Sequence, residues 1–428
     1  MSKKFSSALA LLAVFCLLTG SFLPLVSAQS GATGTAQNAA IISTADAVLK
    51  ETSEIRELSI LRSVKSGAQS RSEIERMVIK NLDTETTPAE MHATEVVLKA
   101  FGLAPPDFEY RSFLIKLLAE QVAGYYDPKA QQFYLADWIE IDGQKPVMAH
   151  ELTHALQDQH FNLKRFDKWP KGDSDAELAA RALIEGDATL AMTLYLAKHP
   201  MIALSFLRTS QETSTEQFNR APRTLRESLL FPYQEGLKWA SHVYRRGGWS
   251  MISEAFTKLP KSSEQILHPE KYFSSEAPVK LTLPNFTRAL GAGWKHIDND
   301  VNGEWGYYLV LDEYLANPSE SRQAAAGWGG DRFAIYEGPN GSPVFVAQIT
   351  SWDTAADAKE FFDAYAKRTQ KRFSDAMFIN GDTRHDWRGP AGIGVIELQG
   401  SRVVILEGIP PRAKVDQFLQ MIRQRRLK

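Results

Sequence analysis

The feature that most constrains this chain is the pentapeptide His-Glu-Leu-Thr-His at residues 150–154. Apolar residues flank it and a proline precedes it, a pattern that predicts a helix. Two histidines four residues apart on a helix project from one face, about one turn apart. His150 and His154 can then bind one Zn²⁺, and Glu151 can accept a proton from a metal-bound water. A chain of this length contains the pentapeptide by chance at about the one-in-a-hundred level, so the prediction depends on a third ligand.

Two residues compete for the third ligand position, and the first is His160. It completes the frame His-x-x-x-His-x-x-Gln-x-x-His, which resembles the metzincin pattern with Gln157 in place of the metzincin glycine. That glycine lets the helix end and the chain turn. Gln157 is a good helix former and a poor residue for positive φ, so we expect the helix to continue and to rotate His160 about 240° away from the metal. We interpret His160 as a structural or surface histidine.

The second candidate is Glu185, which lies in a stretch at residues 174–197 that is predicted to be helical. The sequence Glu-Gly-Asp-Ala at 185–188 resembles the third-ligand segment of several gluzincin metallopeptidases, in which a second helix crosses the first and places a glutamate on the zinc. The resemblance implies Glu185 as the third ligand. Gly186 would permit the close approach of these two helices. Glu177, on the same predicted helix, is the alternative.

Many gluzincins place an aspartate four residues after this glutamate, where it holds the first histidine. This chain has Thr189 at that position, and the nearby acid is Asp187. Since each zinc-bound histidine is expected to form a hydrogen bond through its other ring nitrogen, we consider Asp187, Thr189 and Asp158 for this role.

An open fourth position would make this zinc catalytic. Zinc lowers the pKa of a bound water, and Glu151 would act as general base while the water attacks a carbonyl. Gluzincins stabilise the resulting oxyanion with a His or Tyr from a downstream helix. The candidates here are Tyr233, Tyr244, His268 and Tyr272. We favour His268 because the sequence Leu-His-Pro holds its backbone near a turn. The sequence therefore predicts an exported zinc metallopeptidase that hydrolyses peptide or protein substrates.

Two other functions stay open. In the first, the chain is a non-catalytic zinc-binding protein of the cell envelope that acts as a binding or scaffold module. A structural zinc normally has a fourth protein ligand, and the expected mature chain offers no cysteine for that purpose. In the second, the same centre hydrolyses a non-peptide amide, for instance in the cell wall.

Residues 1–28 have the composition of a secretory signal peptide. Lys3 and Lys4 precede an apolar run at 8–18, and Val-Ser-Ala at 26–28 fits a cleavage site. The only cysteine, Cys16, lies in this segment, so we expect a mature protein without disulfides. We expect it to be exported to the periplasm or the exterior. No later stretch is long and apolar enough to predict a membrane span.

The rest of the chain is expected to form an α+β protein in three regions. Residues 29–100 are mostly helical. Residues 101–275 form a mainly helical, zincin-like metallopeptidase domain, and part of it, about 110–275, resembles a group of poorly characterised exported bacterial proteins. Residues 276–428 alternate strands and helices, which predicts a small, separable α+β domain with helices on one side of an antiparallel sheet.

A β-hairpin is predicted at residues 124–136, directly before the zinc-binding helix. Gluzincins often have an edge strand there, against which an extended peptide can pair; a purely structural hairpin is the alternative. The net charge of −2 and the absence of a long basic block argue against a nucleic-acid partner. Trp328, Trp352 and Trp387 are interpreted as packing residues and not as a glycan platform.

Overall fold

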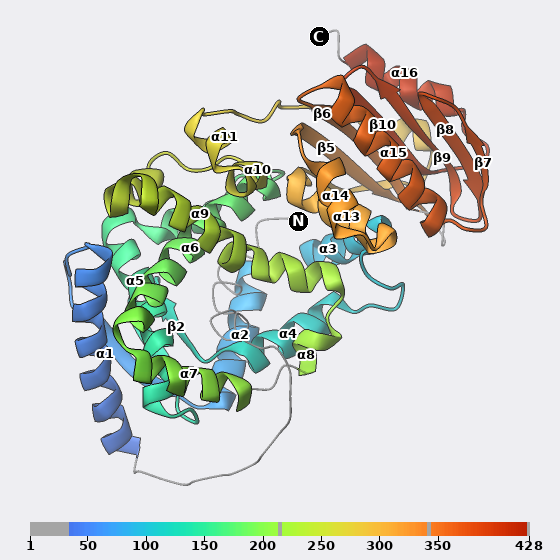
Figure 1. The fold of residues 1–428 in the computed structure, drawn as a ribbon. Coiled ribbons are helices and arrows are strands. Elements are labelled where there is room, and N and C mark those ends of the chain that lie inside the picture. The colour runs from blue at the N-terminus through green and yellow to red at the C-terminus, as the bar shows by residue number, and fades with distance from the viewer. Residues whose placement is uncertain (1–33, 213–215, 340–343, 426–428) are drawn as a thin grey trace.

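The computed structural model of this protein describes residues 34–212, 216–339 and 344–425. Figure 1 shows a mainly helical part, which extends to about residue 275, and a second part built around a β-sheet. The expected α+β class is therefore confirmed. The predicted signal peptide and Cys16 lie outside the described residues.

Among the described residues, the helical part contains eleven α-helices, one 3₁₀ helix and a three-stranded sheet. Its α-helices are α1 (Gly34–Arg56), α2 (Arg71–Glu85), α3 (Pro88–Phe101), α4 (Tyr110–Gln121), α5 (Ile141–Phe161), α6 (Ser174–Lys198), α7 (Pro200–Glu212), α8 (Glu216–Arg220), α9 (Arg223–Ala255), α10 (Ser263–Leu267) and α11 (Pro269–Phe273). A 3₁₀ helix, η1, spans Leu163–Lys168, and the strands are β1 (Lys65–Gln69), β2 (Gly124–Asp127) and β3 (Gln132–Ala136).

The predicted hairpin is confirmed as β2 and β3, which pair antiparallel directly before α5. The sequence did not indicate β1, because Lys-Ser-Gly-Ala-Gln lacks the alternation of a half-buried strand. This strand pairs parallel to β3 in the order β1-β3-β2. One side of β3 is thus occupied by β1, and β2 remains an edge strand.

The helices α5, α6 and α9 form the framework of the helical part. Helix α5 begins at Ile141, so Pro146, the proline that precedes the motif, lies more than one turn inside the helix and not in its first turn. It continues through Gln157 to Phe161, as we expected, and is buried along almost its whole length from Gly143 to Asp158. Helix α9 is a long helix with a kink, where Gly247 and Gly248 have non-helical backbone angles.

The close helix contact at Gly186 involves a different partner from the one we expected. A Cβ atom on Gly186 would lie 2.2 Å from the carbonyl oxygen of Gly236 on α9, and a Cβ on Gly236 would lie 2.3 Å from the carbonyl oxygen of Ala182. The two glycines therefore permit backbone contact between α6 and α9, and not between α5 and α6. No local sequence pattern indicates this contact, because Gly236 lies 50 residues from Gly186.

The second part is organised around a seven-stranded antiparallel sheet with strand order β4-β5-β6-β10-β9-β8-β7. Its strands are β4 (Lys295–Asp300), β5 (Trp328–Glu337), β6 (Phe345–Trp352), β7 (Met377–Asn380), β8 (Arg384–Gly389), β9 (Gly392–Gln399) and β10 (Arg402–Ile409). Its helices are α12 (Thr287–Leu290), α13 (Gly303–Leu315), α14 (Pro318–Ala325), α15 (Ala355–Arg372) and α16 (Val415–Arg425).

Both faces of this sheet are covered, which corrects the expectation of helices on one side only. Phe333 and Ile335 of β5 belong to the core shared with α13 and α15. Their neighbours Ala334 and Tyr336 belong to a second core, with residues 281–294 and the apolar side of α16. The strands therefore carry apolar residues on both faces. The three tryptophans Trp328, Trp352 and Trp387 are all buried, as their interpretation as packing residues requires.

The helical part and the sheet part share one continuous hydrophobic core, which extends from α1 to β10. Arg368 of α15 is buried and donates a hydrogen bond of 2.6 Å to the carbonyl oxygen of Phe101. The rings of Phe101 and Phe333 meet edge to face at 5.3 Å. A cut at residue 275 would therefore expose apolar side chains and a buried cation. The separability of residues 276–428 stays a prediction, which truncation at residue 275 tests.

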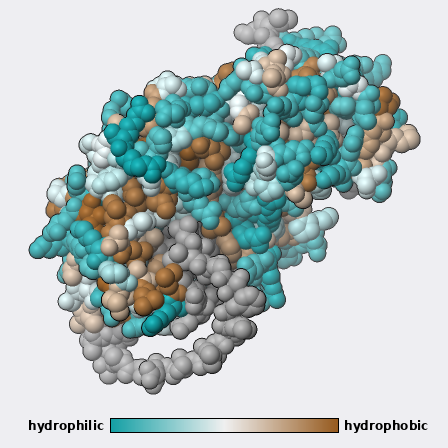
Figure 2. Space-filling model, in the orientation of Figure 1, coloured by the Kyte–Doolittle hydropathy of each residue, from teal (hydrophilic) through white to brown (hydrophobic). Residues whose placement is uncertain are grey.

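The surface of the helical part carries apolar side chains near α1 and α7 (Figure 2). On α7, Met201, Leu204 and Leu207 are exposed. Among the described residues, no helix is by itself long and apolar enough to cross a membrane. Only α6 together with the start of α7, a pair bent by 115°, meets the length and composition test.

Candidate metal centre

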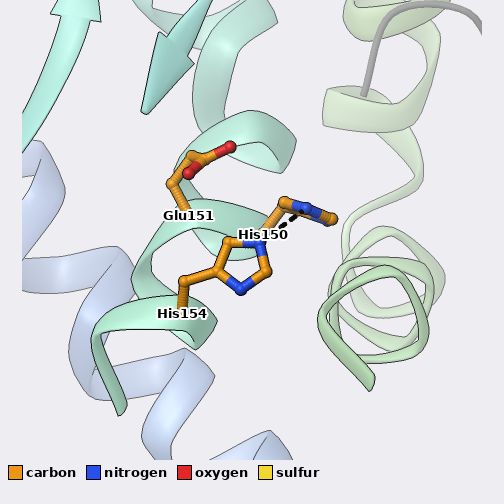
Figure 3. A group of neighbouring side chains, drawn as sticks. All are labelled: His150, Glu151 and His154. Atoms are coloured by element: carbon orange, nitrogen blue, oxygen red, sulfur yellow. Dashed lines mark hydrogen bonds between the residues drawn. The ribbon is translucent and has the colours of Figure 1, made fainter. Parts of the chain in front are cut away.

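His150, His154 and Glu185 bring three potential ligand atoms to one point. The Nε2 atoms of the two histidines are 3.1 Å apart. Oε2 of Glu185 lies 3.1 Å from Nε2 of His150 and 3.3 Å from Nε2 of His154. All three side chains are buried. Figure 3 shows the two imidazoles side by side on α5, as the four-residue spacing predicts.

These distances fit the requirements of a zinc ion. In a tetrahedral site with ligands at about 2.0–2.1 Å, neighbouring ligand atoms are about 3.3–3.4 Å apart. Two neutral imidazoles and one carboxylate form a common catalytic zinc ligand set. The three donor atoms of this group therefore lie close to the separations that a shared zinc ion would impose.

Glu151 lies beside this group and points to another side of α5 (Figure 3). Its carboxylate is near enough for ligand atoms of His150, Glu151 and His154 to lie within 4.8 Å of one another. The backbone N–H of Tyr126 on β2 donates a hydrogen bond of 2.9 Å to Oε2 of Glu151. Burial raises the pKa of Glu151 to about 8, and the nearby Glu185 carboxylate contributes in the same direction.

The second ring nitrogen of His154 is held by a chain of buried polar groups. Its Nδ1 lies 2.8 Å from Oε1 of Gln157, and an Nδ1–H donor there leaves Nε2 free as a metal ligand. The Gln157 amide donates a hydrogen bond of 2.9 Å to Asp187, whose other oxygen accepts one of 2.5 Å from Arg56. Gln157, which distinguishes this chain from the metzincin pattern, thus orients a zinc-ligand candidate. Sequence reasoning missed it, although its i+3 position on the motif helix was visible.

Asp187 is therefore joined to the second histidine through Gln157, and the hydrogen bonds of the described residues include none between Asp187 and either histidine. Its partner Arg56 is fully buried, forms a cation–π contact with Trp249 at 4.5 Å, and donates to the Ser253 hydroxyl. This network ties α1, α5, α6 and the end of α9 together behind the metal centre.

The first histidine has a different environment. Among the described groups, neither Nδ1 of His150 nor the Thr189 hydroxyl has a hydrogen-bond partner, and both are buried. Thr189 is the residue that replaces the aspartate of many gluzincins. Asp158, the third residue that we considered, instead accepts hydrogen bonds from Tyr126 and Arg62.

The alternatives for the third ligand lie elsewhere. His160 contacts the carbonyl oxygen of Ser59 at 2.7 Å on an exposed part of the surface. Glu177 pairs with Arg181 at 2.7 Å, two turns before Glu185 on α6. Of the three candidates, only Glu185 approaches both histidines.

Tyr233 of α9, and not His268, is the aromatic or imidazole side chain next to the metal centre. Its ring stacks on His150 with a centroid distance of 6.0 Å, and its hydroxyl forms a hydrogen bond with Glu185. Burial raises the pKa of this phenol well above its usual value, so it stays protonated. The contact of Gly186 with Gly236 explains the position of Tyr233, because Tyr233 lies one turn before Gly236.

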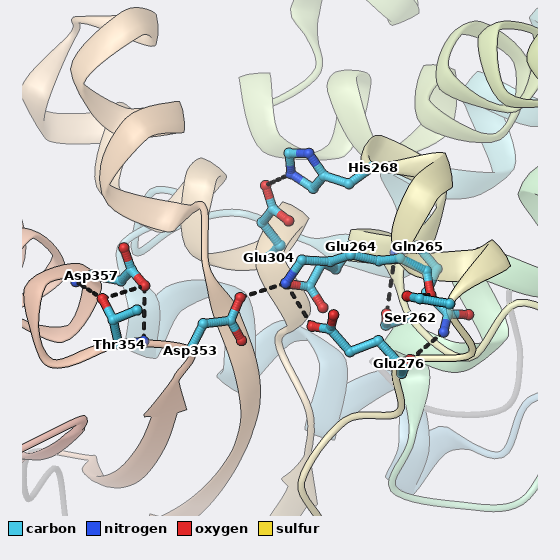
Figure 4. A network of polar contacts seen from close by, with 11 residues as sticks. Ser262, Glu264, Gln265, His268, Glu276, Glu304, Asp353, Thr354 and Asp357 are labelled. Atoms are coloured by element: carbon cyan, nitrogen blue, oxygen red, sulfur yellow. Dashed lines mark hydrogen bonds and ion pairs between the residues drawn. The ribbon is translucent and has the colours of Figure 1, made fainter.

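The expectation for His268 is therefore corrected. Its Nε2 lies 2.9 Å from Glu304 of α13, outside the residues that surround the two histidines (Figure 4). The Leu-His-Pro turn does hold its backbone, between α10 and α11, but it directs the ring to the sheet part. Tyr244 packs against Trp249, and Tyr272 donates to the carbonyl oxygen of Lys258, so neither reaches the centre.

Without a metal, the Glu185 carboxylate pairs with the imidazoles of His150 and His154. Burial opposes the charge on His154, but the Glu185 carboxylate outweighs burial and raises the pKa of His154 to about 9. Burial likewise opposes ionisation of Glu185, but the His154 cation lowers the pKa of this carboxyl to about 2. Burial lowers the pKa of His150. A zinc ion would take the place of the His154 proton and give the Glu185 carboxylate its positive partner.

A cavity of about 230 Å³ opens next to the metal centre. Glu151, His154, Glu185 and Tyr233 line one end of it, together with residues of β2. The other walls come from α3, α6, α9 and α13. The centre is thus buried from one side and faces a ligand-sized space on the other.

A second group of carboxylates lies at the junction of the two parts (Figure 4). Glu264, Glu276 and Asp353 place oxygen atoms within 4.8 Å of one another. Nζ of Lys271 occupies the middle of this group, at 2.6, 2.7 and 2.5 Å from the three side chains.

Residues 289–419 match a family model described as a domain of unknown function, DUF8575. The matched region corresponds to the sheet part, and it contains none of the residues of the candidate metal centre. No curated protein and no solved structure matches the chain.

Proposed function

We propose that this protein is a zinc-dependent metallopeptidase. The observation that carries the proposal is the convergence of Nε2 of His150, Nε2 of His154 and Oε2 of Glu185 at separations of 3.1–3.3 Å. These residues would hold the metal, and a cavity adjoins them on the side of Glu151 and Tyr233. A zinc ion bound there would polarise a substrate carbonyl and make water a stronger nucleophile.

Glu151 would act as general base. It is not needed as a ligand, it lines the cavity, and the Tyr126 N–H fixes one of its oxygens. Accepting a proton from water and passing it to the leaving amine requires a carboxyl with a raised pKa, and burial provides this. Tyr233 replaces His268 as the donor that we assign to the oxyanion, because its protonated hydroxyl lies at the metal end of the cavity.

The edge strand β2 supports a peptide substrate over a small amide. Tyr125, Tyr126 and Asp127 line the cavity, and β3 is the one described strand that pairs with β2. An extended peptide could therefore add its backbone to this strand beside Glu151.

Metal analysis of the purified protein, combined with a general protease assay, tests the proposal. We expect about one zinc per chain, hydrolysis of an unfolded protein substrate, loss of hydrolysis after chelation, and recovery when zinc is added back. A protein that holds zinc and shows no hydrolysis would support the non-catalytic binding protein instead. A protein that holds no zinc would contradict both functions.

A further inference from the structure

The cavity at the metal centre extends along α6 well beyond the reacting groups. Both Ser174, at the start of α6, and Glu185 line it. Eleven residues of α-helix separate them, which corresponds to about 16 Å. An extended peptide advances about 3.3 Å per residue, so a space of this length can take about five residues.

The walls along this length are mainly apolar and belong to both parts of the protein. Leu178 and Leu229 contribute from α6 and α9, and Trp305, Leu309 and Val310 contribute from α13. The sheet part therefore builds one wall of a cavity whose metal ligands all come from the helical part. Figure 1 shows α13 next to the start of α9, where Arg223 contacts Tyr308 of α13.

The charged groups of the wall outside the metal centre are paired with other groups: Glu85 with Lys129 at 2.6 Å, Asp127 with the N–H of Lys129, and Asp175 with the N–H of Ser263. Arg181 and Glu177 both line the cavity, and they form an ion pair with each other at 2.7 Å. Two wall residues, Trp305 and Thr224, carry buried polar atoms that have no hydrogen-bond partner among the described groups. These atoms lie behind the surface of the wall, and the feature that favours a peptide backbone over a hydrocarbon chain is the edge strand β2, whose Tyr125 and Tyr126 line the same cavity.

Gly306 on α13 lines the cavity and has no side chain to fill it. The three atoms nearest to a Cβ built on Gly306 all belong to the side chain of Asn302, at 3.1–3.8 Å. Gly306 lines the cavity and has an ordinary helical backbone, so a larger side chain there would extend into the cavity.

We infer that the cavity selects extended polypeptide segments with bulky, uncharged apolar side chains, and that α13 of the sheet part provides this selection. The inference rests on the proposed peptidase function. It assigns to the region that matches DUF8575 a direct part in substrate binding, as the wall of the substrate cavity.

Binding of short peptides to the full-length Glu151→Gln protein tests this inference without turnover. The probes are acetyl-Leu-Phe-Leu-amide and acetyl-Asp-Phe-Asp-amide, measured by calorimetry with zinc and after chelation. We expect the apolar peptide to bind at least tenfold more tightly. Adding Gly306→Leu should remove this preference, and the matched change Gly306→Ala should keep it, with equal zinc content in all three proteins.

Several results would overturn the inference: equal affinity for the two peptides, an undiminished preference in Gly306→Leu, or tighter binding of decanoate than of the apolar peptide. If Gly306→Leu does not fold, Leu178→Asp on the opposite wall must remove the preference in its place. In another outcome, the protein holds no zinc and still binds the apolar peptide more tightly, and Gly306→Leu removes that difference in affinity. This result would contradict the peptidase function but support the apolar peptide site.

Discussion

Two groups of side chains in this protein have the composition of a metal site, and they are built in opposite ways. Around His150, His154 and Glu185, donors converge in a buried place where the cation paired with Glu185 is a titratable histidine. Around Glu264, Glu276 and Asp353, a lysine ammonium already lies between the three carboxylates. Burial and charge balance, and not the number of carboxylates, therefore distinguish the candidate metal centre from a structural ion cluster.

The two groups also differ in which parts of the protein they join. The metal centre is supported by a buried chain, Gln157-Asp187-Arg56, that stays within the helical part. The Lys271 cluster joins the helical part to the sheet part, because Asp353 follows β6. The first arrangement positions ligands, and the second holds the wall of the cavity against the helices that carry them.

Removing a ligand should give the largest effect. We expect His154→Ala or Glu185→Ala to lower the zinc content from about one ion per chain to near zero, because two remaining ligands cannot hold the metal. Elemental analysis after dialysis measures this. His160→Ala is the matched control and should keep its zinc, as should the double variant Glu276→Gln, Asp353→Asn. Loss of zinc in either control would erase the distinction between the two groups.

Glu151→Gln should reduce hydrolysis by about 10² to 10⁴ while zinc content and fold remain intact. Glutamine has the shape of glutamate but cannot accept the proton. The comparison of turnover with zinc content separates the base from the ligands. Full activity in this variant would contradict the role of Glu151.

Gln157→Leu should weaken zinc binding by about 10- to 100-fold, because it removes the hydrogen bond that orients His154 and leaves Asp187 without its amide donor. Competition with a chelator of known affinity provides the measurement. The control is Gln159→Leu, two residues further along α5. The Gln159 side chain forms its hydrogen bonds with the backbone of Leu61 and Arg62, so this variant should bind zinc like the parent. Equal zinc affinities for the two variants would show that the hydrogen-bonded groups Gln157, Asp187 and Arg56 do not support the metal.

Lys271→Met should destabilise the protein by on the order of 2 kcal/mol without changing the zinc content, since it leaves three carboxylates next to one another. Urea unfolding reports the free energy of unfolding. The control Lys258→Met breaks an exposed pair with Glu254 and should cost less than about 0.5 kcal/mol. Zinc loss in Lys271→Met would mean that the two groups are coupled.

Removing the contact of His268 with Glu304 should give the smallest change in stability, and this change should depend on pH. The hydrogen bond with Glu304 raises the pKa of His268 above 6.5, so the folded state holds this proton more tightly than the unfolded state. The stabilisation is therefore complete below about pH 6.5 and is lost as the pH rises through the folded-state pKa. The stability difference between the parent and His268→Gln should decrease from pH 6 to pH 9. A constant difference would mean that His268 contributes by packing alone.

Local pattern was enough to predict the elements that carry the centre. Spacing placed His150 and His154 on one helical face, and a good helix former at Gln157 carried the helix past the point where His160 could turn back. The hairpin β2–β3 and the helices α3, α6, α13 and α15 also follow from short-range signals such as caps and periodicity. These features depend on neighbours within a few residues.

Tertiary structure decided what these elements meet. The backbone contact of Gly186 with Gly236 brings the Tyr233 turn of α9 to the centre, while His268 contacts Glu304. The covering of both sheet faces and the cavity wall from α13 likewise depend on residues far apart in the chain. The sequence by itself determined which chemistry one helix can offer. Which side chains complete that chemistry was decided by long-range packing, because contacts between distant helices leave no periodic trace in the sequence.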